Sequence, residues 1–103
     1  MTFTIIGRCQ RTGRLGVGIA TYSLAVGSYC PHVKHDVAAL SNQAFVNPPL
    51  GPIAMDFLKN DMAPEEVIEH LKTHDPLLDY RQIGIVGRFG ATACWSGDSC
   101  RPY

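Results

Sequence analysis

The sequence predicts an α+β domain, and three observations predict it. β-branched and apolar residues alternate with small or polar ones near both ends of the chain. Apolar residues recur at helical spacing in the middle, and Pro and Gly separate these segments. The resulting order, β-β-β-α-α-β-β, has strands on both sides of a helical pair, which indicates a layered α+β domain.

Length and composition limit what this domain can be. The chain has 103 residues, of which 46% are hydrophobic and 17% are charged, so one domain over residues 1–103 is expected. Nine basic and nine acidic residues give no net charge, and we therefore expect no nucleic-acid partner. No apolar run approaches the roughly 18 residues of a membrane span, and no signal peptide is readable. We expect a cytoplasmic protein without a membrane partner.

The first two elements are predicted to form a β-hairpin. In the strand Thr2–Arg8, Phe3 and Ile5 point to one side, while the alternate residues point to the other. Gly13 suits the turn, and Leu15–Thr21 returns as the second strand. The return strand has one face of Leu, Val and Ile and one of Gly and Ala. The small face favours close packing against another element, with the floor of a site as the alternative.

The middle of the chain is predicted to contain one strand and two helices. Pro31 breaks regular structure in residues 22–35, and a strand follows over Asp36–Phe45. Residues 47–52 form a loop by composition, and an apolar stripe predicts a helix over Pro52–Lys59. A second helix begins near Pro64 and is stopped by Asp75-Pro76. It should bury Val, Ile and Leu side chains.

The last elements are two strands, over Tyr80–Arg88 and Ala91–Trp95, with Gly90 at the turn between them. Four cysteines, Cys9, Cys30, Cys94 and Cys100, form no C-x-x-C pair. Without a leader sequence, free thiols are expected rather than disulfides. No glycine-rich phosphate loop is present, and we expect no cofactor.

Thr2 is the first candidate for chemistry. Initiator methionine before threonine is commonly removed, which would leave a hydroxyl and an α-amine on one residue. With a pKa near 7.7–8.0, the amine can act as the base for that hydroxyl. This is the nucleophile of N-terminal nucleophile hydrolases. If Met1 is retained, the Thr2 nitrogen is an amide and cannot serve as a base.

Two other groups of residues have alternative interpretations. Cys30, His32 and His35 could hold zinc or copper, although a fourth ligand is not obvious and surface histidines are the simpler explanation. Gln43 and Asn47 follow an apolar strand and could line a cleft or donate to an oxyanion. Turn formation explains Asn47 before Pro48 equally well, and it explains Gln43 less well.

The chain resembles the domain of unknown function 1028 family. The opening Thr2-Phe3-Thr4-Ile5-Ile6-Gly7-Arg8 looks like the family's start, which often reads T-F-S-I-V-A-R. Further blocks follow in order over nearly the whole chain, at residues 12–17, 24–27, 43–44, 47–48, 51–52, 63–67, 75–76 and 81–86. Thr2 matches the family's N-terminal threonine, and Thr21 falls where the family often has serine. Gln43, Asn47 and Gly51 match its middle block.

This resemblance implies the N-terminal nucleophile hydrolase-like superfamily, and with it part or all of a layered αββα sandwich. Family members are usually about twice as long as this chain, which resembles their N-terminal half. Half a sandwich leaves an apolar face and sheet edges uncovered, so we expect a homo-oligomer or a missing C-terminal half.

Together the residues and the resemblance favour a hydrolase of a small amide or peptide-like bond, with a small-molecule or peptide-like substrate. The candidate catalytic residues are Thr2, Thr21, Gln43 and Asn47. The alternatives are a non-catalytic binding or assembly module with the same fold, and a metal-binding module.

Overall fold

A two-stranded antiparallel hairpin opens the chain in the computed structural model, which describes residues 1–100. Strand β1 (Thr2–Arg8) pairs with β2 (Leu15–Thr21), from Thr2 opposite Thr21 to Arg8 opposite Leu15. Gly13 takes a φ of 75° in the turn, which glycine adopts without a steric penalty. The hairpin and its two-faced alternation are confirmed.

A second antiparallel sheet has the strand order β3-β4-β5-β6. Its strands are β3 (Pro31–Lys34), β4 (Ala38–Ala44), β5 (Arg81–Gly87) and β6 (Thr92–Ser96). The prediction that Pro31 breaks regular structure is wrong. Pro31 is instead the first residue of an edge strand, a position where its missing N–H costs no ladder bond. A one-turn helix, η1 (Val26–Ser28), precedes it.

Two helices connect β4 to β5. Helix α1 covers Leu50–Lys59, so it begins two residues earlier than predicted and has Pro52 inside its first turn. It buries Leu50 and Met55 as well as Ala54 and Leu58. Helix α2 covers Pro64–His74 and buries the predicted Val, Ile and Leu side chains at 67, 68 and 71. A one-turn helix, η2 (Leu78–Tyr80), leads into β5.

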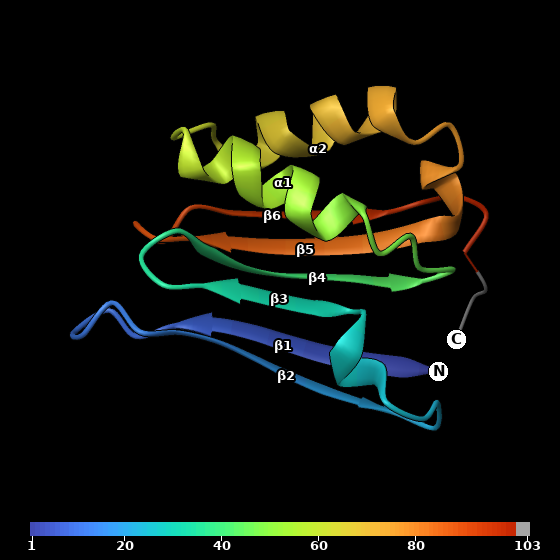
Figure 1. Ribbon diagram of the computed structural model, residues 1–103, viewed down its shortest axis with the longest axis horizontal. Helices are drawn as coiled ribbons and strands as arrows, with labels where there is room; N and C mark the ends of the chain where they lie inside the picture. Colours follow the sequence, from blue (N-terminus) through green and yellow to red (C-terminus); the bar gives the residue numbers. More distant parts are fainter. Residues whose placement is uncertain (101–103) are drawn as a thin grey trace.

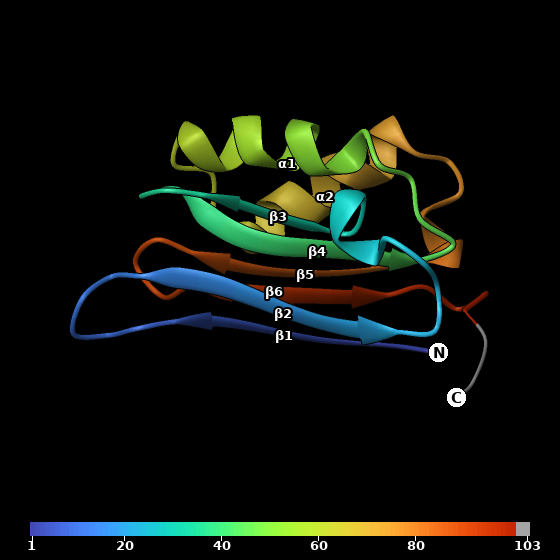
Figure 2. The ribbon, with the colours of Figure 1, turned by 60° about the horizontal axis from the view of Figure 1, so that its bottom comes forward.

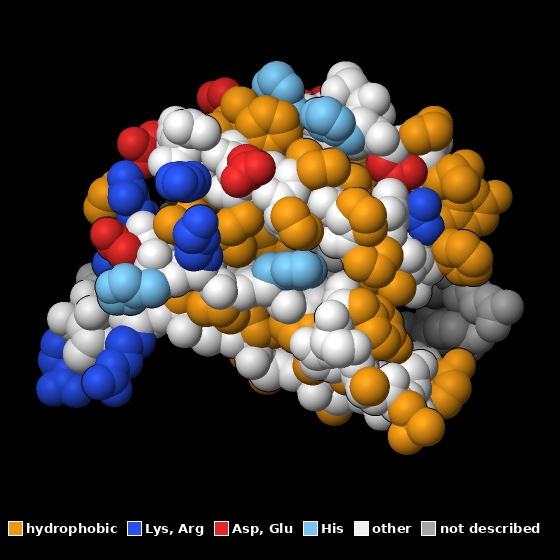
Figure 3. Space-filling view, in the orientation of Figure 1, with side chains coloured by type: hydrophobic (Ala, Val, Ile, Leu, Met, Phe, Trp, Pro, Cys, Tyr) orange, Lys and Arg blue, Asp and Glu red, His pale blue; other side chains and the backbone are white. Residues whose placement is uncertain are grey.

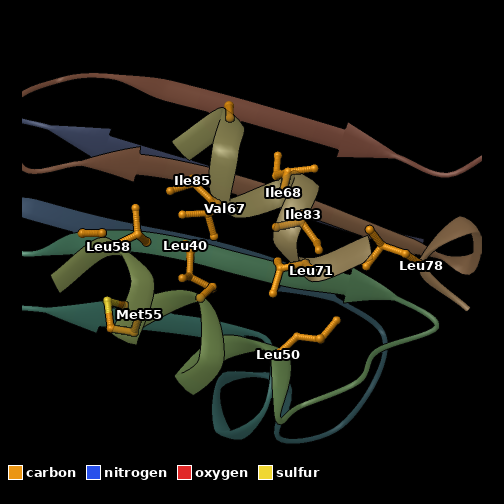
Figure 4. Packing of buried hydrophobic residues seen from close by; sticks show 13 residues of the cluster. Leu40, Leu50, Met55, Leu58, Val67, Ile68, Leu71, Leu78, Ile83 and Ile85 are labelled. Atoms are coloured by element: carbon orange, nitrogen blue, oxygen red, sulfur yellow. The ribbon is translucent and has the colours of Figure 1, made fainter. Parts of the chain in front are cut away.

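The elements form three layers, which confirms a mixed α+β fold with two antiparallel sheets. Figures 1 and 2 show α1 and α2 on one face of the four-stranded sheet and the hairpin on the other. The core lies between the helices and the sheet, and it includes Leu40 and Ile85 from the sheet and Leu71 from α2 (Figure 4). No helix among residues 1–100 has the length and hydrophobicity needed to cross a bilayer.

The hairpin uses its two faces differently. Its inner face contacts the sheet closely: a Cβ added to Gly84 would lie 3.1 Å from Ile6 Cδ1. On its outer face, Phe3 is 66% exposed and Ile5 is 78% exposed. Side chains added at Gly16 and Gly18 would meet nothing within 4 Å among the described residues. The Gly/Ala face of β2 is therefore not packed against any described element, contrary to the packing interpretation favoured above.

Candidate functional site

A cleft of about 740 Å³ lies at the end of the molecule where β1 begins. The hairpin supplies one wall, through Met1, Thr2 and the residues that follow β2. The opposite wall comes from the point where β4 ends and β5 begins, which are neighbours because Ala44 pairs with Arg81. Ser99 and Cys100 complete the rim. This volume lies within the usual range for small-molecule sites.

Thr2 lies in this cleft because it is the first residue of β1. Its hydroxyl lies 3.0 Å from the hydroxyl of Thr21, its cross-strand partner. The Thr21 hydroxyl donates to the Met1 carbonyl oxygen at 3.1 Å and accepts from the Ser23 N–H at 3.4 Å. Since Thr21 has one hydroxyl proton, the bond between the two threonines is donated by Thr2. The structure thus brings together two of the four predicted site residues.

Gln43, on β4, contacts the backbone of Thr2. Its amide nitrogen donates to the Thr2 carbonyl oxygen at 3.3 Å and to Gln82 Oε1 at 3.1 Å. Its amide oxygen accepts from the Thr4 hydroxyl. Both amide hydrogens are therefore hydrogen-bonded within the protein, and the side chain links the start of β1 to the sheet.

Asn47 belongs to a hydrogen-bond network around a buried ion pair. Its side-chain nitrogen donates to Asp75 Oδ2 at 3.2 Å. Arg81 Nε donates to the same oxygen at 2.9 Å, and the side chains of Asp75 and Arg81 are almost completely buried. Asn47 therefore does not join Thr2 and Thr21. It supports Arg81, which lines the cleft.

The environment of Asp75 favours its charged form. Burial raises the pKa of Asp75, but hydrogen bonds from Arg81, the Leu77 N–H and Asn47 outweigh burial. Together they hold the pKa of this carboxyl below its ordinary value. The ion pair consequently stays charged at neutral pH and fixes Arg81 in the cleft wall.

Five residues of the cleft were not predicted from the sequence: the apolar Tyr22, Phe45, Leu77 and Tyr80, and the buried Arg81. The apolar residues come from three connecting segments that are far apart in the sequence, so no spacing joins them. Arg81 did leave a signal, because a charged residue begins a strand whose last five residues are all apolar or glycine.

The candidate metal ligands do not come together. Cys30 is buried and His35 is exposed in the turn after β3. Burial raises the pKa of the Cys30 thiol and lowers the pKa of His32. Within residues 1–100, no three His, Cys, Asp or Glu side chains are arranged to hold a metal ion. All four cysteines have free thiols in this structure.

Comparisons with known proteins identify relatives of this sequence and fold. The sequence model of a family described as "Family of unknown function (DUF1028)" matches residues 2–103. The crystal structure of protein SPO2555 from Silicibacter pomeroyi, assigned to the same family, has a TM-score of 0.91 and 26% sequence identity. The match covers 97% of this chain and 46% of that one, so this chain spans about half of its length. No curated protein matches the sequence.

Proposed function

This chain belongs to the family of unknown function DUF1028, and we propose that it hydrolyses a small amide or peptide-like bond with Thr2 as nucleophile. One observation carries the proposal: Thr2 lines a ligand-sized cleft, and its hydroxyl lies 3.0 Å from a second hydroxyl. A nucleophile needs an open path to its substrate and a polar neighbour that orients it.

The reaction requires removal of Met1, which converts the Thr2 nitrogen from an amide into an amine. The amine takes the hydroxyl proton as Oγ1 attacks the substrate carbonyl, and an oxyanion forms. Collapse of this intermediate breaks the C–N bond, and the ammonium proton goes to the leaving amine. Water then hydrolyses the resulting Thr2 ester and restores the hydroxyl.

Loss of Met1 also changes the role of Thr21. In the chain with Met1, the proton of Thr21 is donated to the Met1 carbonyl oxygen. Without that acceptor, the Thr21 hydroxyl can donate to the Thr2 oxygen or to the substrate. Gln43 acts as a positioning residue, because its donors already hold the start of β1 and Gln82. Asn47 acts at greater distance, through Asp75 and Arg81.

We extend the proposal to the fold of the N-terminal nucleophile hydrolase-like superfamily. The helical layer and the two sheets of this chain would correspond to three of the four layers of an αββα sandwich. The exposed apolar outer face of the hairpin is suited to a second helical layer. Another copy of this chain, or a counterpart of the unmatched part of the Silicibacter protein, would supply that layer.

A binding module with the same fold is the second candidate, and it is favoured by the position of Met1. Met1 lines the cleft, and its carbonyl oxygen accepts the Thr21 proton. A protein that keeps Met1 has the cleft without a free amine, and thus a binding site without a base for Thr2.

Intact mass and two variants distinguish these candidates. Mass spectrometry of the native protein shows whether the chain begins at Thr2. If it does, an amide library should be hydrolysed by wild type and by Thr2→Ser, and not by Thr2→Ala, with the three proteins equally folded by circular dichroism. Activity that survives in Thr2→Ala, or full activity with Met1 retained, would reject the mechanism.

A further inference from the structure

Exposed apolar side chains converge on the cleft from separate loops. Tyr22, Phe45, Leu77 and Tyr80 all line it, and their exposed fractions are 86%, 72%, 51% and 47%. Large apolar side chains that are exposed together mark binding surfaces more often than those scattered singly. Figure 3 shows hydrophobic side chains gathered toward the right-hand end, whereas Lys and Arg gather toward the hairpin turn at the left.

One wall of the cleft is a defined aromatic surface. The Phe45 and Tyr80 rings meet edge to face, with centroids 6.5 Å apart. The Phe45 N–H donates to the Tyr80 carbonyl oxygen at 3.2 Å, which ties the two loops together. Ala44, just before Phe45, has a φ of 71°, in the left-handed region that non-glycine residues rarely adopt. The fold therefore holds Phe45 at the rim at the expense of local backbone strain.

Among the described residues, the cleft offers no uncompensated charged side chain. Arg81 is the one Asp, Glu, Lys or Arg residue that lines it among the described residues. Its Nε and Nη2 donate to Asp75, and its Nη1 donates to the Phe45 carbonyl oxygen. The Thr2 amine must be neutral to act as the base, so it supplies no charged partner in the reacting protein. A charged substrate group would therefore lose water here without compensation from the described residues, which is unfavourable.

We propose that the cleft binds an uncharged aromatic or branched aliphatic group, attached to the amide that lies beside Thr2. The position of the amide beside Thr2 rests on the proposed function. The choice of an uncharged aromatic or aliphatic group rests only on the residues of the cleft wall. A neutral N-acyl aromatic amide is the class of compound that fits this description. Asp-, Glu- and Lys-derived amides are disfavoured.

Binding is measured separately from catalysis. The Thr2→Ala variant has no nucleophile, so N-acetyl-phenylalaninamide can be titrated into it by NMR without turnover. N-acetyl-lysinamide and N-acetyl-aspartamide, titrated in the same way, are the charged probes. We expect the aromatic probe to bind at least about tenfold more tightly than either.

Matched aromatic variants locate the binding. In the Thr2→Ala background, Phe45→Ala should weaken binding of the aromatic probe by about tenfold. Phe89→Ala should leave it unchanged, because Phe89 is 80% exposed and does not line the cleft. Equal binding of charged and aromatic probes, no binding of the aromatic probe, or equal effects of the two variants would overturn the inference. Binding of the aromatic probe without hydrolysis by the Thr2-initiated protein would support this inference and reject only the proposed reaction.

Discussion

The Thr2 and Thr21 hydroxyls face each other at 3.0 Å across the open end of the hairpin. The contact follows from strand pairing, because side chains directly opposite each other in an antiparallel pair lie on the same face. It places a second proton donor beside the proposed nucleophile, and the nucleophile thus depends on a residue 19 positions away.

Replacing Thr21 by valine should impair hydrolysis more than folding. Valine keeps the shape of threonine and loses the hydroxyl that contacts Thr2. We expect kcat/KM to fall by about 10- to 100-fold, because the Thr2 hydroxyl loses its orienting partner. Thr21→Ser should restore most of the activity, since serine supplies the same hydroxyl. Equal kcat/KM for wild type and Thr21→Val, measured on Thr2-initiated protein, would show that Thr21 has no such role.

Asp75→Asn should destabilise the fold strongly. The substitution removes the charge that compensates the buried Arg81 guanidinium, and breaking a buried ion pair typically costs about 3–5 kcal/mol. Urea unfolding at pH 7 measures the loss. The control is Glu69→Gln, which breaks the exposed pair with Lys72 and should change the free energy of unfolding by less than about 1 kcal/mol. Similar effects of both substitutions would contradict this account of the ion pair.

The same carboxyl makes stability depend on acid pH. The pKa of Asp75 lies below its ordinary value of 3.8 in the folded protein, so the unfolded chain binds the proton more readily. The ion pair therefore contributes its full stability above about pH 4 and loses it as the pH falls from 3.8 toward the folded pKa. Urea midpoints between pH 5 and pH 2.5 should fall less in Asp75→Asn than in wild type. Parallel curves would contradict the expectation.

Gly51→Ala tests a close contact at the start of α1. A Cβ at Gly51 would lie 2.2 Å from His32 Nε2, a buried nitrogen that lacks a hydrogen-bond partner within the described residues. We expect the substitution to destabilise the protein by about 1–3 kcal/mol through overpacking. In a His32→Ala background it should instead be neutral or stabilise by up to about 1 kcal/mol, because Ala favours helix. A double-mutant cycle by urea unfolding measures this coupling, and simple additivity would exclude the contact.

The elements that the sequence predicted well are those with local signals. Alternation defined the two faces of β1, and Pro64 marked the start of α2. The start of α1 was misplaced because Pro52, a residue typical of a helix start, lies two residues inside it. Strand β3 was missed because it has only four residues and begins with proline, which gives it no local strand signal. Its pairing with β4 makes this segment a strand, and that pairing is not visible in the local sequence.

The candidate site was only partly predictable for a similar reason. Thr21 follows from hairpin pairing and from the family resemblance, whereas the contact between Gln43 and Thr2 depends on how the hairpin lies on the second sheet. Asn47 combines a turn position with a long-range bond to Asp75, and its sequence context shows only the turn. The aromatic wall could not be predicted from the sequence, since Phe45 and Tyr80 are brought together only by the pairing of β4 with β5.

Gly97→Ala should displace the rim of the cleft that Ser99 and Cys100 form. A Cβ at Gly97 would lie 2.0 Å from the Asp79 carbonyl oxygen, and backbone atoms cannot yield as a flexible side chain can. Gly97 N–H donates to the Arg81 carbonyl oxygen at 3.1 Å, and Ser99 N–H donates to that of Asp79 at 3.0 Å. Because these bonds hold the turn that carries Cys100, we expect a loss of at least about 2 kcal/mol and a more accessible Cys100 thiol.

Urea unfolding and maleimide labelling measure these two effects, in a Cys9→Ser, Cys94→Ser background that removes the exposed thiols. The control is Gly18→Ala, where an added Cβ meets nothing within 4 Å among the described residues. It should be neutral or stabilise by about 0.5–1 kcal/mol, since alanine loses less backbone freedom on folding. If Gly97→Ala is as stable as Gly18→Ala and labels at the same rate, the turn does not depend on the close approach of Gly97 to Asp79. A loss confined to Gly97→Ala would show that this glycine anchors the rim that faces Thr2.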